Sequence, residues 1–392
     1  MSDDDLGRPM TGALGRYTRD LTSEARAGRL EPVRCRDEEI ARVIDILLRH
    51  GKNNPALVGP AGVGKTAVAE GLAQRLALGD VPLVLRTTKL LALDHVALLA
   101  GTSYRGQYEE RIRALVHETS ADPDVVLFID ELHNLIGQGT SIGVAMDAAN
   151  MLKPSLVRGD FRVIGATTGE EYERWICNDS ALERRFQRVL VRELTSEETM
   201  DVLRARVERL ERHHNVVITD EALQAAVSLT DVHMLDRRRP DRALDVLDEA
   251  CAHTQAVTVY TPRAATLILQ RRHLLRAPAK RRDAGGAGEA DAGAAEPGDE
   301  LDHMARGGLS ALERFGAELE AIFVGGPTPT GAPAPRPPAP EPAPPPRPRP
   351  PSLAVLDVEV RTVLIEDGVV VRGLDVARVV ALATGQTVRW SE

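Results

Sequence analysis

Eight consecutive residues near the start of the chain have the spacing of a phosphate-binding loop. The run Gly59-Pro-Ala-Gly-Val-Gly-Lys-Thr66 fits G-x-x-x-x-G-K-[ST], and it lies between an apolar run and a segment with helical periodicity. Glycines in such a loop let backbone N–H groups converge on phosphate oxygens, and the N-terminus of the following helix adds partial positive charge. The predicted ATP-binding positions are Gly59, Pro60, Ala61, Gly62, Val63, Gly64, Lys65 and Thr66, with Lys65 at the β- and γ-phosphates and Thr66 on Mg²⁺.

Two carboxylates follow a continuous apolar run and complete the expected chemistry. Asp130 and Glu131 come directly after residues 125–129. An acidic pair at the carboxyl end of a buried parallel strand lies beside the ligand in this class of sheet. We expect Asp130 to hold Mg²⁺ through water and Glu131 to orient and deprotonate the water that attacks the terminal phosphate.

The elements around these residues indicate an α/β fold. Short apolar strands are predicted at 55–59, 90–94, 125–129, 162–165 and 189–191, and a helix is predicted at 65–78. Continuous apolar strands that alternate with helices are typical of a parallel sheet covered on both faces. Residues 196–275 show only helical periodicity, which predicts a helical lid.

Composition divides the rest of the chain. Residues 276–300 are rich in Ala, Gly, Asp and Glu and cannot bury a core. Within 327–351 lie 14 of the 25 prolines, which favours a semi-rigid polyproline II spacer. The predicted segments are an acidic disordered tail at 1–13, an ATPase core at 14–195, the helical lid at 196–275, a disordered linker at 276–308, an amphipathic helix at 309–324, a Pro-rich linker at 325–351 and a small C-terminal element at 352–392.

Charge and cysteine content indicate which partners and which cellular compartment to expect. The formal net charge of −9 argues against a nucleic-acid partner, since such proteins usually present a basic face. The three cysteines Cys35, Cys177 and Cys251 have no pair spacing, so we expect a reducing compartment and no disulfide frame. No run approaches the roughly 18 apolar residues of a membrane span. We therefore expect a cytoplasmic protein without a membrane partner.

Several further signatures, in order from about Leu14 to Gln255, resemble the first ATPase domain of the Clp-type AAA+ unfoldases. They are Tyr17-Thr-Arg-Asp-Leu21, Arg36-Asp-Glu-Glu-Ile40, Lys52-Asn-Asn-Pro55, Gly101-Thr-Ser-Tyr-Arg-Gly106, Phe128-Ile-Asp-Glu-Leu-His133, Met146-Asp-Ala-Ala-Asn-Met-Leu-Lys-Pro154, Gly165-Ala-Thr-Thr168, Ala181-Leu-Glu-Arg-Arg-Phe186 and Pro240-Asp-Arg-Ala243. The resemblance implies an AAA+ P-loop domain with a three-layer parallel sheet, followed by a small helical lid domain.

The same resemblance implies roles that the residues alone do not establish. Thr168 would be the polar sensor near the γ-phosphate, and Arg242 a basic second sensor on the lid. Arg184 and Arg185 would be arginine fingers that reach a neighbouring subunit's site and stabilise charge on the transferred phosphoryl group. Fingers supplied in trans imply a ring, expected as a hexamer. A pore loop that grips a translocating polypeptide would comprise Tyr104, Arg105 and Gly106, with a second Gly-rich loop at 137–149.

Two departures from the family pattern bear on the function. Arg34 and Cys35 stand where the family usually has Ile-Gly, in the stretch that frames the adenine. The sequence shows no second Walker motif, although residues 369–388 resemble the lead-in to the family's second ATPase domain. The peptidase-docking loop of some members lies on that second domain, so no peptidase partner is expected.

These observations support two functional hypotheses. The leading one is an ATP-driven remodeller that pulls a polypeptide through a ring. The alternative is a nucleotide-dependent scaffold or regulatory module with little turnover, which would assemble with an adaptor or a full-length Clp relative. Glu131, Arg184, Arg185 and Tyr104 disfavour the scaffold, because a scaffold needs none of them. A nucleic-acid motor is disfavoured by the acidic charge balance, and the short basic clusters at 237–239 and 280–282 are interpreted as solvated faces.

Overall fold

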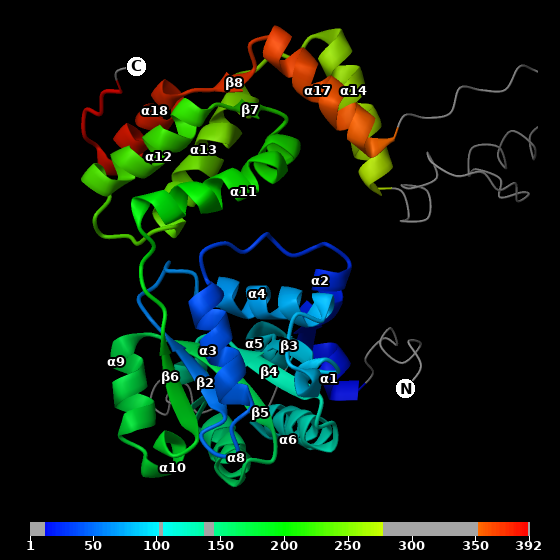
Figure 1. Cartoon of the computed structure of the whole chain (residues 1–392), viewed down its shortest axis with the longest axis vertical. Coiled ribbons are helices and arrows are strands. Elements are labelled where there is room, and N and C mark those ends of the chain that lie inside the picture. Colours follow the sequence, from blue (N-terminus) through cyan, green and yellow to red (C-terminus); the bar gives the residue numbers. More distant parts are fainter. Residues whose placement is uncertain (1–11, 102–104, 137–144, 277–351, 391–392) are drawn as a thin grey trace, which may run out of the picture. The chain divides into compact units, whose positions relative to one another are not determined.

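The computed structural model describes residues 12–101, 105–136, 145–276 and 352–390 (Figure 1). These residues fall into two compact units. One contains the described residues up to Ile268 together with those from Glu359 onward, and the other contains the described parts of Leu269–Val358. The first unit carries the central sheet and the lid, and it is the unit that holds the candidate site.

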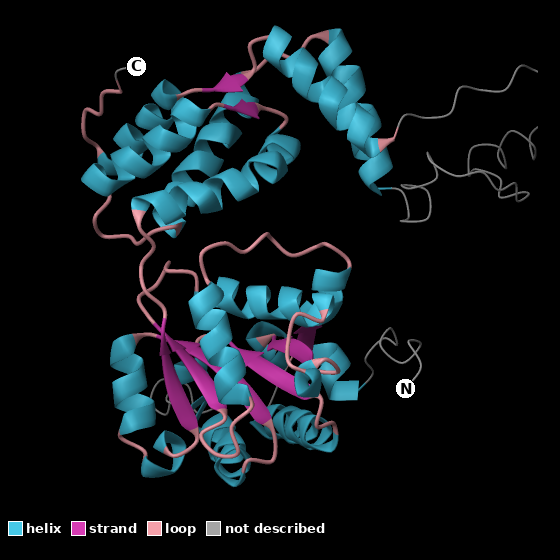
Figure 2. Ribbon diagram, in the orientation of Figure 1, coloured by secondary structure: helices cyan, strands magenta, loops and turns pink. Residues whose placement is uncertain are grey.

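A six-stranded, mostly parallel sheet forms the centre of the ATPase segment (Figure 2). Its strand order is β1-β3-β4-β5-β2-β6, and only β1 runs antiparallel to its neighbour. The strands are β1 (Thr18–Asp20), β2 (Asn54–Val58), β3 (Lys89–Leu93), β4 (Val125–Ile129), β5 (Arg162–Thr167) and β6 (Phe186–Leu190). All five predicted parallel strands are therefore confirmed, and β1 is an edge strand that the sequence pattern did not indicate.

Both faces of the sheet are covered by helices, which produces the predicted three layers. Along β4, Val126 and Phe128 pack on one face while Leu127 and Ile129 pack on the other, because side chains alternate along a strand. The first face is covered by α2 (Leu21–Arg26), α3 (Asp37–Leu47) and α4 (Lys65–Leu78). The second is covered by α1 (Gly12–Tyr17), α6 (Arg105–Ala121), α7 (Leu132–Ile136) and α8 (Ala145–Arg158).

Short helices connect the strands at the sheet edges. They are the 3₁₀ turn η2 (Leu83–Leu85), α5 (His95–Leu99), α9 (Gly169–Tyr172), the π-helical turn η3 (Glu173–Cys177) and α10 (Ser180–Glu183). Three of them begin at a side-chain cap, and the cap of α5 is Asp94. Thr168 caps α9 and Asp179 caps α10, each by accepting hydrogen bonds from the first-turn backbone N–H groups. These caps fix where the chain turns after β5 and before β6.

The lid is a helical unit with a small two-stranded sheet. It comprises α11 (Ser196–His214), β7 (Val217–Ile218), α12 (Asp220–His233), α13 (Asp241–Val257), β8 (Val370–Val371) and α18 (Gly373–Thr384). The start of α14 (Pro262–Arg276) and the end of α17 (Leu353–Glu366) also belong to this first unit, whereas the rest of these two helices lies in the second unit. The α11 helix starts with a capping box between Thr195 and Glu198, and it ends at Asn215 in the left-handed conformation.

The C-terminal segment is part of the lid. Strand β8 pairs in parallel with β7, with Val370 opposite Val217 and Val371 opposite Ile218. Buried side chains from α17, β8 and α18 share one hydrophobic core with α11, α12 and α13. The sequence analysis predicted a lid at 196–275 and a separate element at 352–392, whereas in the structure described residues from both segments build the same core.

Some predictions lie outside the described residues. These are residues 1–11 of the predicted acidic tail, Tyr104, residues 137–144 of the Gly-rich loop predicted at 137–149, the linker segments at 277–308 and 325–351, and the amphipathic helix at 309–324. None of the helices in the described part of the chain combines the length and the apolar composition that a membrane span requires.

Candidate functional site

The loop between β2 and α4 has the conformation that phosphate binding requires. Gly62 and Gly64 adopt φ angles of 77° and 93°, in the left-handed region that glycine enters without steric cost. Gly59 has a different constraint, since a Cβ there would lie 2.4 Å from the carbonyl oxygen of Val191. Gly64 is the N-cap of α4, so the free N–H groups of the first helical turn face the loop.

Lys65 is held inside this loop by backbone carbonyls. Its ammonium donates to the carbonyl oxygens of Gly59 at 3.0 Å and Pro60 at 2.9 Å. Burial lowers the pKa of Lys65, although Asp130, Glu131 and Glu171 oppose the change. A half-desolvated cation without a carboxylate partner within the loop is a suitable counter-charge for a phosphate.

Thr66 and Asp130 are joined directly. The Thr66 hydroxyl donates to Oδ2 of Asp130 at 2.9 Å. Hydroxyl and carboxylate oxygens are hard ligands of the kind that Mg²⁺ prefers, and they lie at the end of the loop where phosphates would enter. The donor set therefore fits Mg²⁺, with these two side chains as its protein contacts.

Glu131 is positioned by a chain of polar contacts. Its carboxylate lies 3.3 Å from Nε2 of His133, and Nδ1 of His133 lies 2.9 Å from Oε2 of Glu171. Glu171 also accepts hydrogen bonds from the hydroxyls of Thr167 at 3.1 Å and Thr168 at 2.8 Å. Burial acts to raise the pKa of Glu171, but hydrogen bonds from Thr168 and Thr167 and the charge of His133 together lower it. The end of β5 is thereby linked to the predicted general base.

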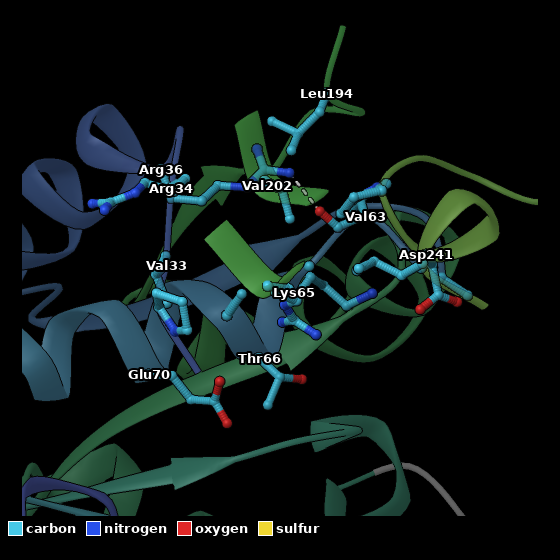
Figure 3. A pocket seen from close by; sticks show the side chains of 18 of the residues that line it. Val33, Arg34, Arg36, Val63, Lys65, Thr66, Glu70, Leu194, Val202 and Asp241 are labelled. Atoms are coloured by element: carbon cyan, nitrogen blue, oxygen red, sulfur yellow. Dashed lines mark hydrogen bonds between the residues drawn. The ribbon is translucent and has the colours of Figure 1, made fainter. Parts of the chain in front are cut away.

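A cavity of about 360 Å³ contains these groups and extends to the lid (Figure 3). That volume lies within the usual range for small-molecule sites. The polar end has Lys65, Thr66, Asp130 and Glu131. Besides the phosphate loop and α4, the lining includes residues of the segment before α3 and of the lid, among them Pro32, Val33, Arg34, Leu194, Val202 and Leu244. The apolar members of this set suit a nucleobase.

Arg36 is a site residue to which the sequence analysis assigned no role. Its side chain is 2 % exposed and donates to the carbonyl oxygens of Val63 at 2.5 Å and Arg192 at 3.0 Å, while Glu39 pairs with it at 2.8 Å. Arg36 therefore ties the phosphate loop to the segment that enters the lid. The Arg-Asp-Glu-Glu signature marked the position, but the two carbonyl acceptors are visible only in three dimensions.

Cys35 occupies a backbone conformation that glycine favours. Its φ is 59°, and such a conformation costs a non-glycine residue about 1 kcal/mol or more. This explains why Gly stands at this position in the family pattern. Burial is the main cause that raises the pKa of Cys35, and the carboxylates of Asp201 and Glu198 raise it further.

The structure separates Thr168 and the two arginines from the cavity. Thr168 lines a second depression together with Gly59 and Pro60, and its hydroxyl is engaged in the α9 cap. Arg185 donates to the carbonyl oxygen of Arg158 at 3.0 Å. Arg184 is exposed and has no partner among the described residues.

Arg242 lies inside the lid and does not line the cavity. It is 5 % exposed, pairs with Asp231, and approaches Glu193 at 3.8 Å. The role of Arg242 as a second sensor on the lid therefore stays a prediction. The neighbouring Asp241 lines the cavity instead. The basic cluster at 237–239 is also paired, with Glu193, Asp231 and Asp245.

Two family models match the chain. Residues 55–194 match the model described as ATPase family associated with various cellular activities (AAA), and residues 195–290 match the AAA lid domain. Together with the parallel sheet and the phosphate loop, these matches define an ATPase domain with its lid. Residues 55–290 of the chain are therefore an ATPase domain of the AAA family with its lid.

Within that family the ATPase segment is of the Clp type. It is 53 % identical over 253 residues to chaperone protein ClpB of Gloeobacter violaceus, covering 64 % of this chain and 29 % of that protein. It is also 53 % identical over 241 residues to ClpB of Pseudomonas putida, covering 61 % and 28 %. The matched region spans less than a third of the length of these relatives.

Solved structures of Hsp104 share the fold. The chain is 39 % identical to a closed-state Hsp104 with ATPγS and FITC casein, at a TM-score of 0.57, over 67 % of this chain and 50 % of that one. It is 40 % identical to the Saccharomyces cerevisiae Hsp104–ADP complex, at a TM-score of 0.58, over 67 % and 49 %.

Proposed function

We propose that this protein binds Mg²⁺–ATP in the cavity at the end of β2 and hydrolyses it to remodel polypeptides. The observation that carries the proposal is the 2.9 Å contact between Thr66 and Asp130, with Lys65 and Glu131 in the same cavity. A purely structural loop would need neither a desolvated lysine nor a hydroxyl–carboxylate pair beside it. The combination is suited to phosphoryl transfer to water.

Each side chain then has a chemical task. Lys65 and the N–H groups at the start of α4 bind and orient the phosphates. Thr66 and Asp130 hold Mg²⁺, which supplies charge neutralisation on the phosphate oxygens. Glu131 takes a proton from the attacking water, and the contact with His133 fixes the direction of its carboxylate. Thr168 acts through Glu171 and His133 on Glu131, as a positioning residue.

We further propose that turnover requires a ring of subunits, with a hexamer as the expected form. Arg184 is exposed and unpartnered among the described residues, so it is available to a neighbouring subunit's phosphates. The relatives support a polypeptide as the substrate, because Hsp104 was solved with casein. The predicted pore residues Tyr104, Arg105 and Gly106 would make that contact.

Steady-state ATP hydrolysis tests the proposal. We would measure turnover of the purified chain over a series of protein concentrations, with and without unfolded casein. Turnover that rises with protein concentration and with casein would support a ring that handles polypeptides. ATP binding with no turnover under any of these conditions would favour the alternative function, a nucleotide-dependent scaffold that assembles with a partner.

A further inference from the structure

A lid arginine in the nucleotide cavity has a buried N–H group that no described residue satisfies. Arg206 projects from α11 of the lid and lines the same cavity as Lys65 and Thr66. Its Nε is buried and makes no hydrogen bond, and no carboxylate among the described residues forms an ion pair with its guanidinium. Leaving a buried guanidinium N–H unsatisfied is costly, so a partner from outside the chain is expected.

The surroundings of Arg206 place it near the phosphate end of the cavity. It is close enough to Glu70 and Asp241 to influence both carboxylates. Glu70 is one turn after Thr66 on α4, and a Cβ on Gly62 would lie 3.0 Å from Cβ of Asp241. Both carboxylates therefore flank the phosphate loop (Figure 3).

Arg206 is one of several cations near these two carboxylates, and Glu70 also lies 3.6 Å from the guanidinium of Arg19. Burial raises the pKa of Glu70, and Arg19 and Arg206 oppose that rise. Burial also raises the pKa of Asp241, with Asp245 adding to it and Arg237 and Arg206 opposing it. Arg206 therefore offsets part of the negative charge that these carboxylates place beside the phosphate loop.

We infer that Arg206 is a nucleotide-binding residue contributed by the lid, and that its guanidinium contacts phosphate oxygens of a bound nucleoside di- or triphosphate. A planar guanidinium can donate two hydrogen bonds to one phosphate, which a lysine cannot do. The contact joins the lid to the nucleotide, a role that the sequence analysis gave to Arg242. The inference rests on the proposed function, since it needs a nucleotide in this cavity.

The first test compares dissociation constants for ATP, ADP and AMP, measured by competition against a fluorescent ADP. Arg206→Met keeps the apolar stem and removes the charge, and we expect about tenfold weaker binding of ATP and ADP with AMP little changed. The dissociation constants of Arg206→Lys for ATP and ADP should lie between those of the wild type and those of Arg206→Met. Arg204→Met is the matched control, because Arg204 is on the same helix, is 58 % exposed and lies outside the cavity lining.

A second test separates contact with the ligand from simple charge balance. If Arg206 only neutralises its neighbours, then adding Glu70→Gln and Asp241→Asn to Arg206→Met should restore ADP affinity. If Arg206 contacts phosphate, affinity should stay reduced in the triple variant. Restored affinity would overturn the inference, and so would equal losses for AMP and ATP, which would move the contact to the base or ribose.

The proposed function and the inference fail in different ways. A wild-type chain that binds no nucleotide would overturn both. A wild-type chain that binds ATP, loses binding in Lys65→Ala, and is unaffected by Arg206→Met would overturn the inference alone. Thermal unfolding of each nucleotide-free variant shows whether a lost affinity reflects a lost fold.

Discussion

Arg184 and Arg185 are adjacent in the sequence, yet only the second is held by its own chain. The guanidinium of Arg185 donates to the carbonyl oxygen of Arg158 at the end of α8, while Arg184 follows α10 with its side chain exposed. The sequence presents the pair as equivalent candidates for a finger. The structure favours Arg184 as the group that can leave its own subunit without breaking a contact.

Substitution of the two arginines should therefore give different phenotypes. We expect Arg184→Ala to retain ATP binding and lose turnover by about 10³-fold, because an arginine finger acts on the transition state. Arg185→Ala should lower the free energy of unfolding by about 1 kcal/mol through the lost hydrogen bond. ATPase assays and urea denaturation of both variants would show this. If Arg185→Ala loses turnover and Arg184→Ala lowers the free energy of unfolding instead, then Arg185 is the arginine finger.

The phosphate-loop lysine and the predicted base should also differ. Glu131→Gln should bind ATP normally and lose turnover by about 10²- to 10⁴-fold, since only proton removal is lost. Lys65→Met should abolish binding without lowering the melting temperature, because burial already disfavours the charged lysine in the nucleotide-free protein. Calorimetric titration and thermal unfolding measure the two properties separately. Wild-type turnover in Glu131→Gln would remove Glu131 from the role of base.

The lid should depend on the C-terminal segment. Val371 is fully buried against the lid core, so Val371→Asp would bury an unpaired charge and should destabilise the lid by about 3 kcal/mol or more. Leu374→Asp is the control, because Leu374 is 57 % exposed on α18. Urea denaturation followed by circular dichroism compares them. Equal free energies of unfolding for Val371→Asp and Leu374→Asp would contradict the finding that Val371 packs in the hydrophobic core of the lid.

Acid should weaken the segment that enters the lid. Hydrogen bonds from Arg192 lower the pKa of Glu198 to about 2, below its ordinary value of 4.5. A depressed carboxyl pKa stabilises the fold above the ordinary value, and this contribution is lost as pH falls from about 4.5 toward 2. Stability measured from pH 7 to pH 3 should thus decline less steeply in Glu198→Gln than in wild type. If stability falls equally with pH in the wild type and in Glu198→Gln, the Arg192–Glu198 pair does not contribute to the pH dependence of stability.

The thiol of Cys35 should react slowly near neutral pH. Burial and the nearby carboxylates raise its pKa above the ordinary 9.0, so little thiolate is present at pH 7. Labelling rates with a thiol reagent, measured in a variant that carries Cys177→Ser and Cys251→Ala, should increase with pH and still be increasing at pH 9.0. Rapid labelling at pH 7 that ATP slows would instead identify an activated thiol at the nucleotide site.

The sequence was informative where chemistry depends on neighbours along the chain. The spacing from Gly59 to Thr66 predicted both the loop and the start of α4, and apolar runs predicted the five parallel strands. Asp130 was predicted from its place after β4, and the contact with Thr66 agrees with that placement. These features follow from local geometry.

Other features depend on contacts between distant residues and could not be predicted in that way. Strands β7 and β8 have two residues each, too few for a periodic signal, and they meet only because the core of the lid closes around them. Arg36 and Arg206 resemble many exposed arginines in sequence. One is buried against two carbonyl oxygens and the other faces the cavity, and only the packing of the lid and the phosphate loop distinguishes them.

The pairing of β7 with β8 has a topological consequence. The Thr219 hydroxyl donates to the carbonyl oxygen of Val371 across 152 residues of chain, and Thr261 pairs with Asp367 beside it. The segment between α14 and α17 is therefore a closed loop in the polymer sense, and doubling its length should cost only about 0.6 kcal/mol of closure entropy. A single peptide-bond cut within that segment would turn the lid into a two-piece complex. Its stability would then depend on the concentration of the two pieces.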